Sequence, residues 1–180
     1  MDITLKTLTE TQLIECKEDI LRNGVIIPLL RKIGLHGVRP YHGPREFGID
    51  VLFESVDFFD RPKYFGVSVK TERLDYTAKE EPKRNLQTIC YQISKAKKAK
   101  FPSSNYTQVY LDGYYVITSK SVSREAVDFI LDNQRDFSYI DIIDGQELFR
   151  IIQEMEHLRH RLTSWKHNFA PVAERIYTEK

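Results

Sequence analysis

The sequence has few cysteines and almost no net charge. Its 180 residues contain two cysteines, Cys16 and Cys90, which lie far apart and in no C-x-x-C arrangement. This usage is typical of a reduced, intracellular protein in which both cysteines are small core residues. With 27 Lys and Arg against 26 Asp and Glu, the formal net charge is +1. No global positive field is available to attract nucleic acid, so any binding of a polyanion requires a local basic patch.

Long apolar runs and several well-known motifs are also missing. No apolar run approaches the length of a membrane span, and the N-terminal MDITLKTLTE lacks the apolar centre of a signal peptide. We therefore expect a soluble, cytoplasmic protein without membrane contacts. The absence of Walker A, G-x-G-x-x-G and G-x-S-x-G motifs argues against a nucleotide-driven motor, a dinucleotide enzyme and a serine hydrolase within this chain. A content of 41% hydrophobic and 29% charged residues suits one domain with a sizeable core.

The hydrophobic pattern predicts alternating helices and strands. Apolar residues recur at helical spacing over residues 8–33, where Gly34 provides a stop, and Asn23-Gly24 with Pro28 predict a kink or a break. The other elements follow from alternation, helical spacing and turn residues. They are a short strand at 38–41, strands at 49–58 and 64–70 joined by a turn at 60–62, a helix at 85–100, a strand at 109–119 interrupted at Asp112-Gly113, a helix from Ser121 or Ser123 to about Asn133, a strand at 138–144 and a closing helix from 145.

This order of elements predicts an α/β fold. An early antiparallel hairpin followed by strand–helix–strand crossovers gives a central sheet of mixed direction, flanked by helices on both faces. We expect a single domain over residues 1–180. Residues 154–180 are predicted to form a helical extension that could lead to further domains of a larger protein.

Asp50 and Lys70 are the residues best placed to carry chemistry. Asp50 begins the first hairpin strand and Lys70 ends the second, so the two are predicted to be neighbours at the open end of the hairpin. An aspartate, a lysine and a second acid suffice for metal-assisted phosphodiester hydrolysis. Carboxylates hold Mg²⁺, and the ammonium stabilises an attacking hydroxide or the developing phosphorane charge. From spacing alone, an ordinary ion pair or a strand that ends with Lys70 in solvent is the commoner explanation.

Several short motifs occur in a defined order along the chain. G-I-D-(x17)-S-V-K spans residues 48–70, between a preceding helix and a helix that contains Gln92. It is accompanied by HGPREFGIDVLF (42–53), YQISKA (91–96), YYVITSKSVSREAVDFI (114–130) and IIDGQELFRII (142–152). In order and spacing these motifs resemble the catalytic core of the PD-(D/E)XK nuclease superfamily, and they are closest to its Mrr-like restriction endonuclease branch. The resemblance covers about residues 12–153, which would be the core of the domain.

The resemblance implies a restriction endonuclease-like fold and roles for four residues. Asp50 matches the metal-binding aspartate of the family, and Lys70 matches its catalytic lysine. Gln92 matches a glutamine on the helix that lines the site. Glu46 matches a glutamate that often precedes the aspartate and that could help to hold metal or to shape the loop.

An acid on the first helix often completes the site in this family. The candidates here are Glu15, Glu18 and Asp19, of which we favour Glu18. The resemblance therefore implies Asp50, Glu46 and Glu18 as metal ligands. The implied cofactor is Mg²⁺, with Mn²⁺ as an alternative.

Ser68 departs from the family pattern. The family has Asp, Glu or sometimes Gln two residues before the lysine, because that side chain shares the metal with the aspartate. A serine hydroxyl is a neutral, weak ligand, so the site would lose one negative charge. Glu46, Glu72 or the first helix could supply the missing carboxylate. Alternatively, the position has been altered, or the domain has lost cleavage and kept binding.

A local basic patch could bind nucleic acid. Lys95, Lys97 and Lys98 follow Gln92 on one predicted helix and could track a phosphate backbone, although a solvated helix face is at least as common an explanation. Arg45 and His42, in the loop before Asp50, could contact the substrate.

The sequence therefore predicts a Mg²⁺-dependent deoxyribonuclease that cleaves DNA internally, with double-stranded DNA as partner, in restriction or anti-phage defence. Because each site in such enzymes cuts one strand, we expect a homodimer or larger homo-oligomer. Two alternatives remain open. One is a non-cleaving nucleic-acid-binding module with a degenerate site, and the other is a scaffold that uses the fold for interaction alone.

Overall fold

The computed structural model of the protein describes residues 5–41, 46–76, 80–134 and 139–156, with the backbone alone for 80–84. In chain order the elements are α1 (Glu10–Glu15), α2 (Glu18–Ile20), the π-helix η1 (Leu21–Ile26), α3 (Ile27–Ile33), β1 (His36–Pro40), β2 (Val51–Val56), β3 (Pro62–Lys70), α4 (Glu80–Lys98), β4 (Phe101–Pro102), β5 (Gln108–Val109), β6 (Gly113–Thr118), α5 (Arg124–Asn133) and β7 (Ile140–Ile143). A further helix, which we call the last helix, covers residues 145–156.

The predicted helical region near the N-terminus is confirmed, but the position of its break is different. The chain leaves the helix at Cys16, and a new helix starts after Lys17, whereas η1 and α3 continue through Asn23-Gly24 without interruption. A π-turn carries an extra residue per hydrogen-bonded ring. It leads directly into α3, where Pro28 lies in the first turn and its missing N–H is tolerated. Gly34, at φ 95°, ends α3 as predicted.

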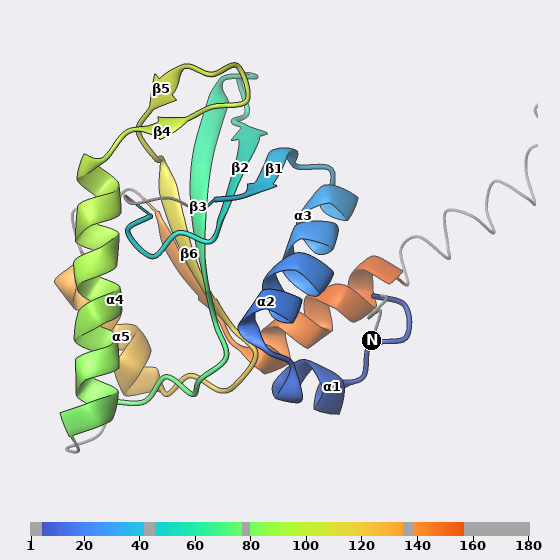
Figure 1. The fold of residues 1–180 in the computed structure, drawn as a ribbon, viewed down its shortest axis with the longest axis vertical. Coiled ribbons are helices and arrows are strands. Elements are labelled where there is room, and N and C mark those ends of the chain that lie inside the picture. Colours follow the sequence, from blue (N-terminus) through green and yellow to red (C-terminus); the bar gives the residue numbers. More distant parts are fainter. Residues whose placement is uncertain (1–4, 42–45, 77–79, 135–138, 157–180) are drawn as a thin grey trace, which may run out of the picture.

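A five-stranded sheet of mixed direction forms the centre of the protein (Figure 1). Its strand order is β1-β2-β3-β6-β7. β1 pairs antiparallel with β2, and β2 with β3, whereas β3–β6 and β6–β7 are parallel pairs. The predicted hairpin, the mixed sheet and the α/β class are therefore confirmed. The crossover from β3 to β6 contains α4, and α5 connects β6 to β7.

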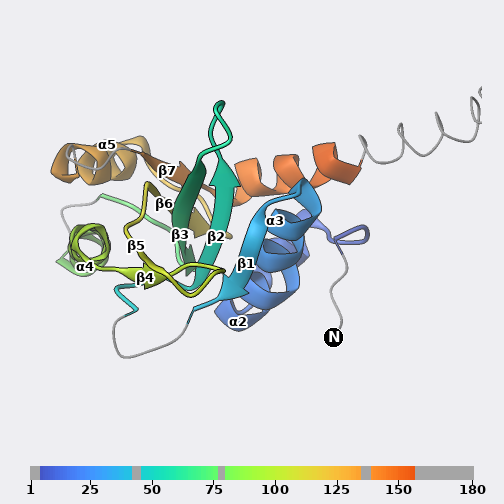
Figure 2. The ribbon, with the colours of Figure 1, turned by 90° about the horizontal axis from the view of Figure 1, so that it is seen from above.

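Helices cover both faces of the sheet, as Figure 1 and Figure 2 show. On one face, the N-terminal helices and the last helix pack in an apolar cluster that includes Val67 and Val69 of β3. On the other face, α4 and α5 pack in a second cluster that includes Tyr114 and Val116 of β6. Side chains alternate along a strand, so β3 places its valines on the first face and Ser68 on the face of α4.

Both cysteines belong to the core, as the sequence predicts. Cys90 is buried within the α4 cluster, and Cys16 is half-buried against the opposite cluster. Burial raises the pKa of each thiol, which keeps it protonated and unreactive. None of the helices within the described residues is both long and apolar enough to cross a membrane.

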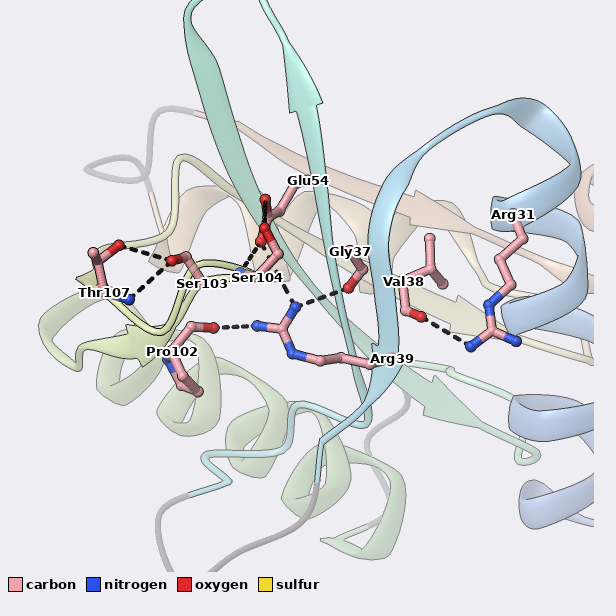
Figure 3. A network of polar contacts seen from close by, with 9 residues as sticks. All are labelled: Arg31, Gly37, Val38, Arg39, Glu54, Pro102, Ser103, Ser104 and Thr107. Atoms are coloured by element: carbon pink, nitrogen blue, oxygen red, sulfur yellow. Dashed lines mark hydrogen bonds and ion pairs between the residues drawn. The ribbon is translucent and has the colours of Figure 1, made fainter.

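A small hairpin of β4 and β5 packs beside the edge of the sheet (Figure 3). β4 has no counterpart among the predicted strands. The strand predicted at 109–119 is divided into β5 and β6, which confirms the interruption predicted at Asp112-Gly113. The Arg39 guanidinium donates to the Gly37 and Pro102 carbonyl oxygens, and so links β1 to β4. Beyond β4, the Ser104 hydroxyl donates to Glu54 Oε2 at 2.8 Å. These polar contacts attach the small hairpin to β1 and β2.

Two glycines provide a test of the packing around the last helix. A Cβ atom on Gly145 would lie 2.2 Å from the Ser119 carbonyl oxygen, whereas one on Gly24 would meet Ile20 Cγ2 at an ordinary 3.8 Å. We expect Gly145→Ala to lower the free energy of unfolding by about 1–3 kcal/mol, because the backbone at Ser119 or at residue 145 must shift to make room for the Cβ atom. Gly24→Ala, the matched control, should raise it by up to about 1 kcal/mol. Urea unfolding measures both. Equal effects of the two substitutions would contradict this close contact.

Candidate functional site

The β2–β3 hairpin brings Asp50 next to the end of β3. Val51 pairs with Val67, so Asp50 is the first residue beyond the ladder. Its backbone N–H donates to the Val67 carbonyl at 2.8 Å, and its carboxylate Oδ2 accepts the Val69 N–H at 2.7 Å. Asp50 is therefore fixed beside Val69, one residue before Lys70. This is the neighbourhood that the hairpin spacing predicts.

The Asp50 carboxyl is surrounded by several charges in a mostly buried position. Burial raises its pKa above the usual value, and this effect outweighs the Val69 N–H and the Lys70 ammonium, which lower the pKa. The Glu18 carboxylate raises the pKa further, and the Arg22 guanidinium lowers it. Arg22 Nη1 lies 3.8 Å from Asp50 Oδ1, and the two side chains are only 14% and 17% exposed. The Asp50 carboxylate thus lies where the charges of one acidic and two basic side chains act on it.

Glu18 and Arg22 reach this position from the N-terminal helices. They are four residues apart across α2 and η1, a spacing that places two side chains on one side of a helix. Of the three acids considered from the sequence, Glu18 is the one whose charge acts on Asp50. Arg22 was not predicted as a site residue. Its position one helical turn after Glu18 was the signal that could have identified it.

Gln92 lies against the loop that precedes Asp50. A Cβ atom on Gly48 would be 2.4 Å from both Cδ and Oε1 of Gln92, so the amide of α4 packs directly on this glycine. Gly48 has φ 70°, a conformation that favours glycine. Glu46 begins the same loop, where its carbonyl oxygen accepts the Ile49 N–H at 2.9 Å. Gln92 and Glu46 are thus both associated with the loop that positions Asp50.

Ser68 is completely buried beneath the site. Its hydroxyl lies against the hydroxyl of Tyr114 and lowers the pKa of that phenol, although burial has the larger, opposite effect and raises it. No well-aligned hydrogen bond to Ser68 Oγ is found among the described residues. The Tyr114 hydroxyl instead donates to the Gly48 carbonyl oxygen at 3.1 Å. Tyr114, against which Ser68 packs, therefore supports the Asp50 loop from beneath.

The two carboxylates near the end of the hairpin are of the ligand type that Mg²⁺ prefers. Asp50 and Glu18 are hard oxygen donors, and Mg²⁺ in proteins is often bound by one or two carboxylates together with waters and substrate phosphates. Within the part of the chain that the structure describes, no group of three or more His, Cys, Asp or Glu could hold a metal ion. The predicted set of Asp50, Glu46 and Glu18 therefore does not form one ligand group.

The predicted nucleic-acid-binding residues are placed in part. His42 and Arg45 lie outside the described residues. Lys95, Lys97 and Lys98 lie in the last turn of α4, and Lys95 Nζ is 5.2 Å from the centre of the Tyr91 ring. Lys95 follows Gln92 by three residues, so both lie on the same side of α4.

Comparison of the chain with models of protein families, with curated proteins and with solved structures gave no match. Conclusions about the chemistry of the site therefore come from its geometry and not from a related protein. The decisive features are the buried Asp50, its neighbours Lys70, Glu18 and Arg22, and the absence of a carboxylate at Ser68.

The raised pKa of Asp50 predicts that its charge destabilises the fold. The folded protein holds the Asp50 proton more tightly than the unfolded chain, so the free energy of unfolding falls as pH rises above the ordinary Asp pKa of about 3.9. Asp50→Asn keeps an oxygen for the Val69 N–H and removes the charge. We expect a higher midpoint of thermal unfolding at pH 7, and a gain that vanishes below about pH 3.

Circular dichroism melts from acid to neutral pH measure this difference. Asp128→Asn, on the exposed side of α5, is the matched control and should leave the midpoint unchanged. An Asp50→Asn protein that is less stable than the wild type at pH 7 would show that the attraction of Lys70 and Arg22 exceeds the cost of burial.

Proposed function

We propose that this chain is a metal-dependent endonuclease domain that hydrolyses phosphodiester bonds of double-stranded DNA, in restriction or anti-phage defence. The observation that carries the proposal is the fixed Asp50 carboxylate at the end of the β2–β3 hairpin, where the charges of Lys70 and Glu18 act on it. A mostly buried carboxylate, with an ammonium and a second, exposed carboxylate close enough to act on it, provides the groups that phosphodiester hydrolysis requires.

The order of the elements supports a restriction endonuclease-like core. The hairpin with Asp50 and Lys70 follows a helical region and precedes α4, whose Gln92 packs against the Asp50 loop. This is the arrangement that the resemblance to the PD-(D/E)XK superfamily implies. Chain order alone does not require Gln92 to reach Gly48, so this contact adds support beyond the motifs.

The side chains then have distinct roles. Asp50 and Glu18 would hold Mg²⁺ or Mn²⁺, which when bound lowers the pKa of a water and polarises the phosphate. Lys70 stabilises the negative charge that develops on the attacked phosphate. Gln92 keeps the Asp50 loop in place. The Arg22 guanidinium lies beside Asp50 and takes no part in bond making or breaking. Its positive charge would attract the phosphate backbone.

A second candidate function is favoured by Ser68. Its side chain is fully buried and its hydroxyl is a neutral, weak ligand, so the site has one carboxylate fewer than the family pattern requires. A site weakened in this way could bind DNA without cleaving it.

Plasmid DNA with Mg²⁺ or Mn²⁺ distinguishes the two functions. We expect the wild type to nick or linearise the plasmid, and Lys70→Ala to reduce the rate by about 100-fold or more, as the loss of one charge-stabilising group does elsewhere. Lys6→Ala, at an exposed lysine near the N-terminus, is the control and should cleave like the wild type. Cleavage that survives Lys70→Ala would mean that Asp50 and Lys70 are not the active site.

Ser68→Glu separates the remaining outcomes. If the wild type binds DNA without cutting it and Ser68→Glu cuts, the chain is a binding module with a degenerate site. A melting curve of the variant checks that the buried glutamate is accommodated. If the wild type neither cuts nor binds, both functions are wrong and the fold serves as a scaffold.

The lysines of α4 give a separate prediction about DNA binding. We expect Lys95→Glu combined with Lys98→Glu to weaken binding of a DNA duplex uniformly across sequences. The slope of log affinity against log salt should become shallower by about 0.9 for each phosphate contact that is lost. Fluorescence anisotropy at several salt concentrations measures this slope. An unchanged slope would identify these exposed lysines as a solvated helix face.

A further inference from the structure

The tip of the β2–β3 hairpin exposes two aromatic rings. Phe58 is 95% exposed and Phe59 is 70% exposed, and the adjacent Val56 is 53% exposed. We call residues 56–61 the hairpin tip. Figure 2 shows this hairpin extending beyond the other strands of the sheet. Large contiguous apolar groups are rarely left in water on a protein that has no partner for them.

The hairpin tip is held in one conformation. The Asp57 carboxylate accepts the backbone N–H groups of Phe59 at 2.9 Å and Arg61 at 3.1 Å, and it also accepts Arg61 Nε at 2.9 Å. These contacts lower the pKa of Asp57, whose side chain is 21% exposed. The Arg61 guanidinium also lies over the Phe59 ring, 5.2 Å from its centre. The two rings are thus presented by a turn that is already ordered, which lowers the entropic cost of binding.

An apolar groove begins at the base of the same hairpin. We call it the lateral groove. It has a volume of about 310 Å³ and lies between α3, the sheet and the last helix. Its walls include Leu30, Ile33, Phe53, Phe65, Leu148 and Ile151. Ile33, at its rim, is 44% exposed. Ser55 also lines the groove and is adjacent to Val56, so groove and tip are neighbours on one strand.

We propose that the occupant of the lateral groove is the hairpin tip of a second copy of this chain. Each protomer would insert Phe58 and Phe59 into the groove of the other, around a two-fold axis. Because tip and groove are neighbours on β2, both contacts can form at once, which closes the assembly as a dimer and prevents a chain of copies. The proposal is independent of the proposed nuclease activity.

The charges around the tip favour a protein partner over nucleic acid. The hairpin tip contains two acidic residues, Asp57 and Asp60, and one basic residue, Arg61, so its formal charge is −1. A phosphate backbone would be repelled by this charge. The lateral groove accepts apolar groups, and aromatic side chains are the residues that most often anchor protein interfaces.

The area of the two tips indicates a weak, reversible dimer. An aromatic side chain buries about 150–250 Å², so insertion of two rings that are 95% and 70% exposed would bury roughly 330 Å² of each tip. Two equivalent contacts then bury roughly 660 Å² of tip surface, which is below the range of about 1,200–2,000 Å² for tight specific interfaces and in the class of weak, transient ones.

Sedimentation equilibrium of the whole chain tests the proposal. We expect the wild type to be a dimer, and both Phe58→Asp with Phe59→Asp and the groove variant Ile33→Asp to raise the dimer dissociation constant by about 30-fold or more. Tyr106→Asp is the matched control. It replaces an aromatic residue that is 91% exposed on the β4–β5 loop, and the protein should remain dimeric. Unchanged circular dichroism melts show that the variants fold.

Mixing the tip variant with the groove variant makes the test more specific. In the reciprocal dimer this pair retains one intact contact, so the mixture should associate more strongly than either variant alone. A monomeric wild type overturns the proposal and leaves the groove to another occupant. Tip or groove variants that dimerise as tightly as the wild type also overturn it, and so does a mixture that gains no association.

Discussion

The hydrogen bond from the Val69 N–H to the Asp50 carboxylate is the interaction on which the site depends. It joins Asp50, the residue before β2, to Val69 near the end of β3, just beyond the last antiparallel pair of the two strands. The bond fixes the direction of the carboxylate, and it places the charge where Lys70, Glu18 and Arg22 can act on it. Without this hydrogen bond the Asp50 carboxylate would not be held in the position where the other three charges act on it.

The supports of this interaction come from all layers of the fold. η1 provides Arg22 from one face of the sheet, and α4 provides Gln92 from the other. Tyr114 of β6 reaches through the second core cluster to the Gly48 carbonyl. Burial makes the Asp50 charge unfavourable, and the surrounding contacts offset only part of this effect. A buried, partly compensated charge is a feature of functional sites more often than of purely structural ones.

Local signals in the sequence were sufficient to predict the hairpin, the mixed sheet and the helices on both faces. Alternation, turn residues and helical spacing each act over a few neighbours, and the Asp50–Lys70 neighbourhood follows from the hairpin alone. The break at Cys16 was missed because the Thr9–Gln12 capping box makes α1 a separate unit, and glycine and proline were given too much weight. Tertiary contacts decided the rest.

Arg22 illustrates what local signals cannot supply. Its role depends on the packing of η1 across the end of β2; the spacing from Glu18 places both side chains on one side of the helix but does not tell which distant aspartate they approach. The burial of Ser68 beside Tyr114 similarly depends on the parallel pairing of β3 with β6. β4 escaped prediction because two residues are too few to show any period.

Arg39 of β1 and Arg31 of α3 have a consequence for solubility. β1 is an edge strand, and the exposed backbone of an edge strand is a template on which strands of other molecules can aggregate. In this protein the Gly37 carbonyl accepts from Arg39 at 2.8 Å and the Val38 carbonyl accepts from Arg31 at 3.0 Å (Figure 3). Guanidinium groups therefore already occupy two backbone acceptors of this edge strand. The polar network that attaches the β4–β5 hairpin thus also protects the sheet from growing at this edge.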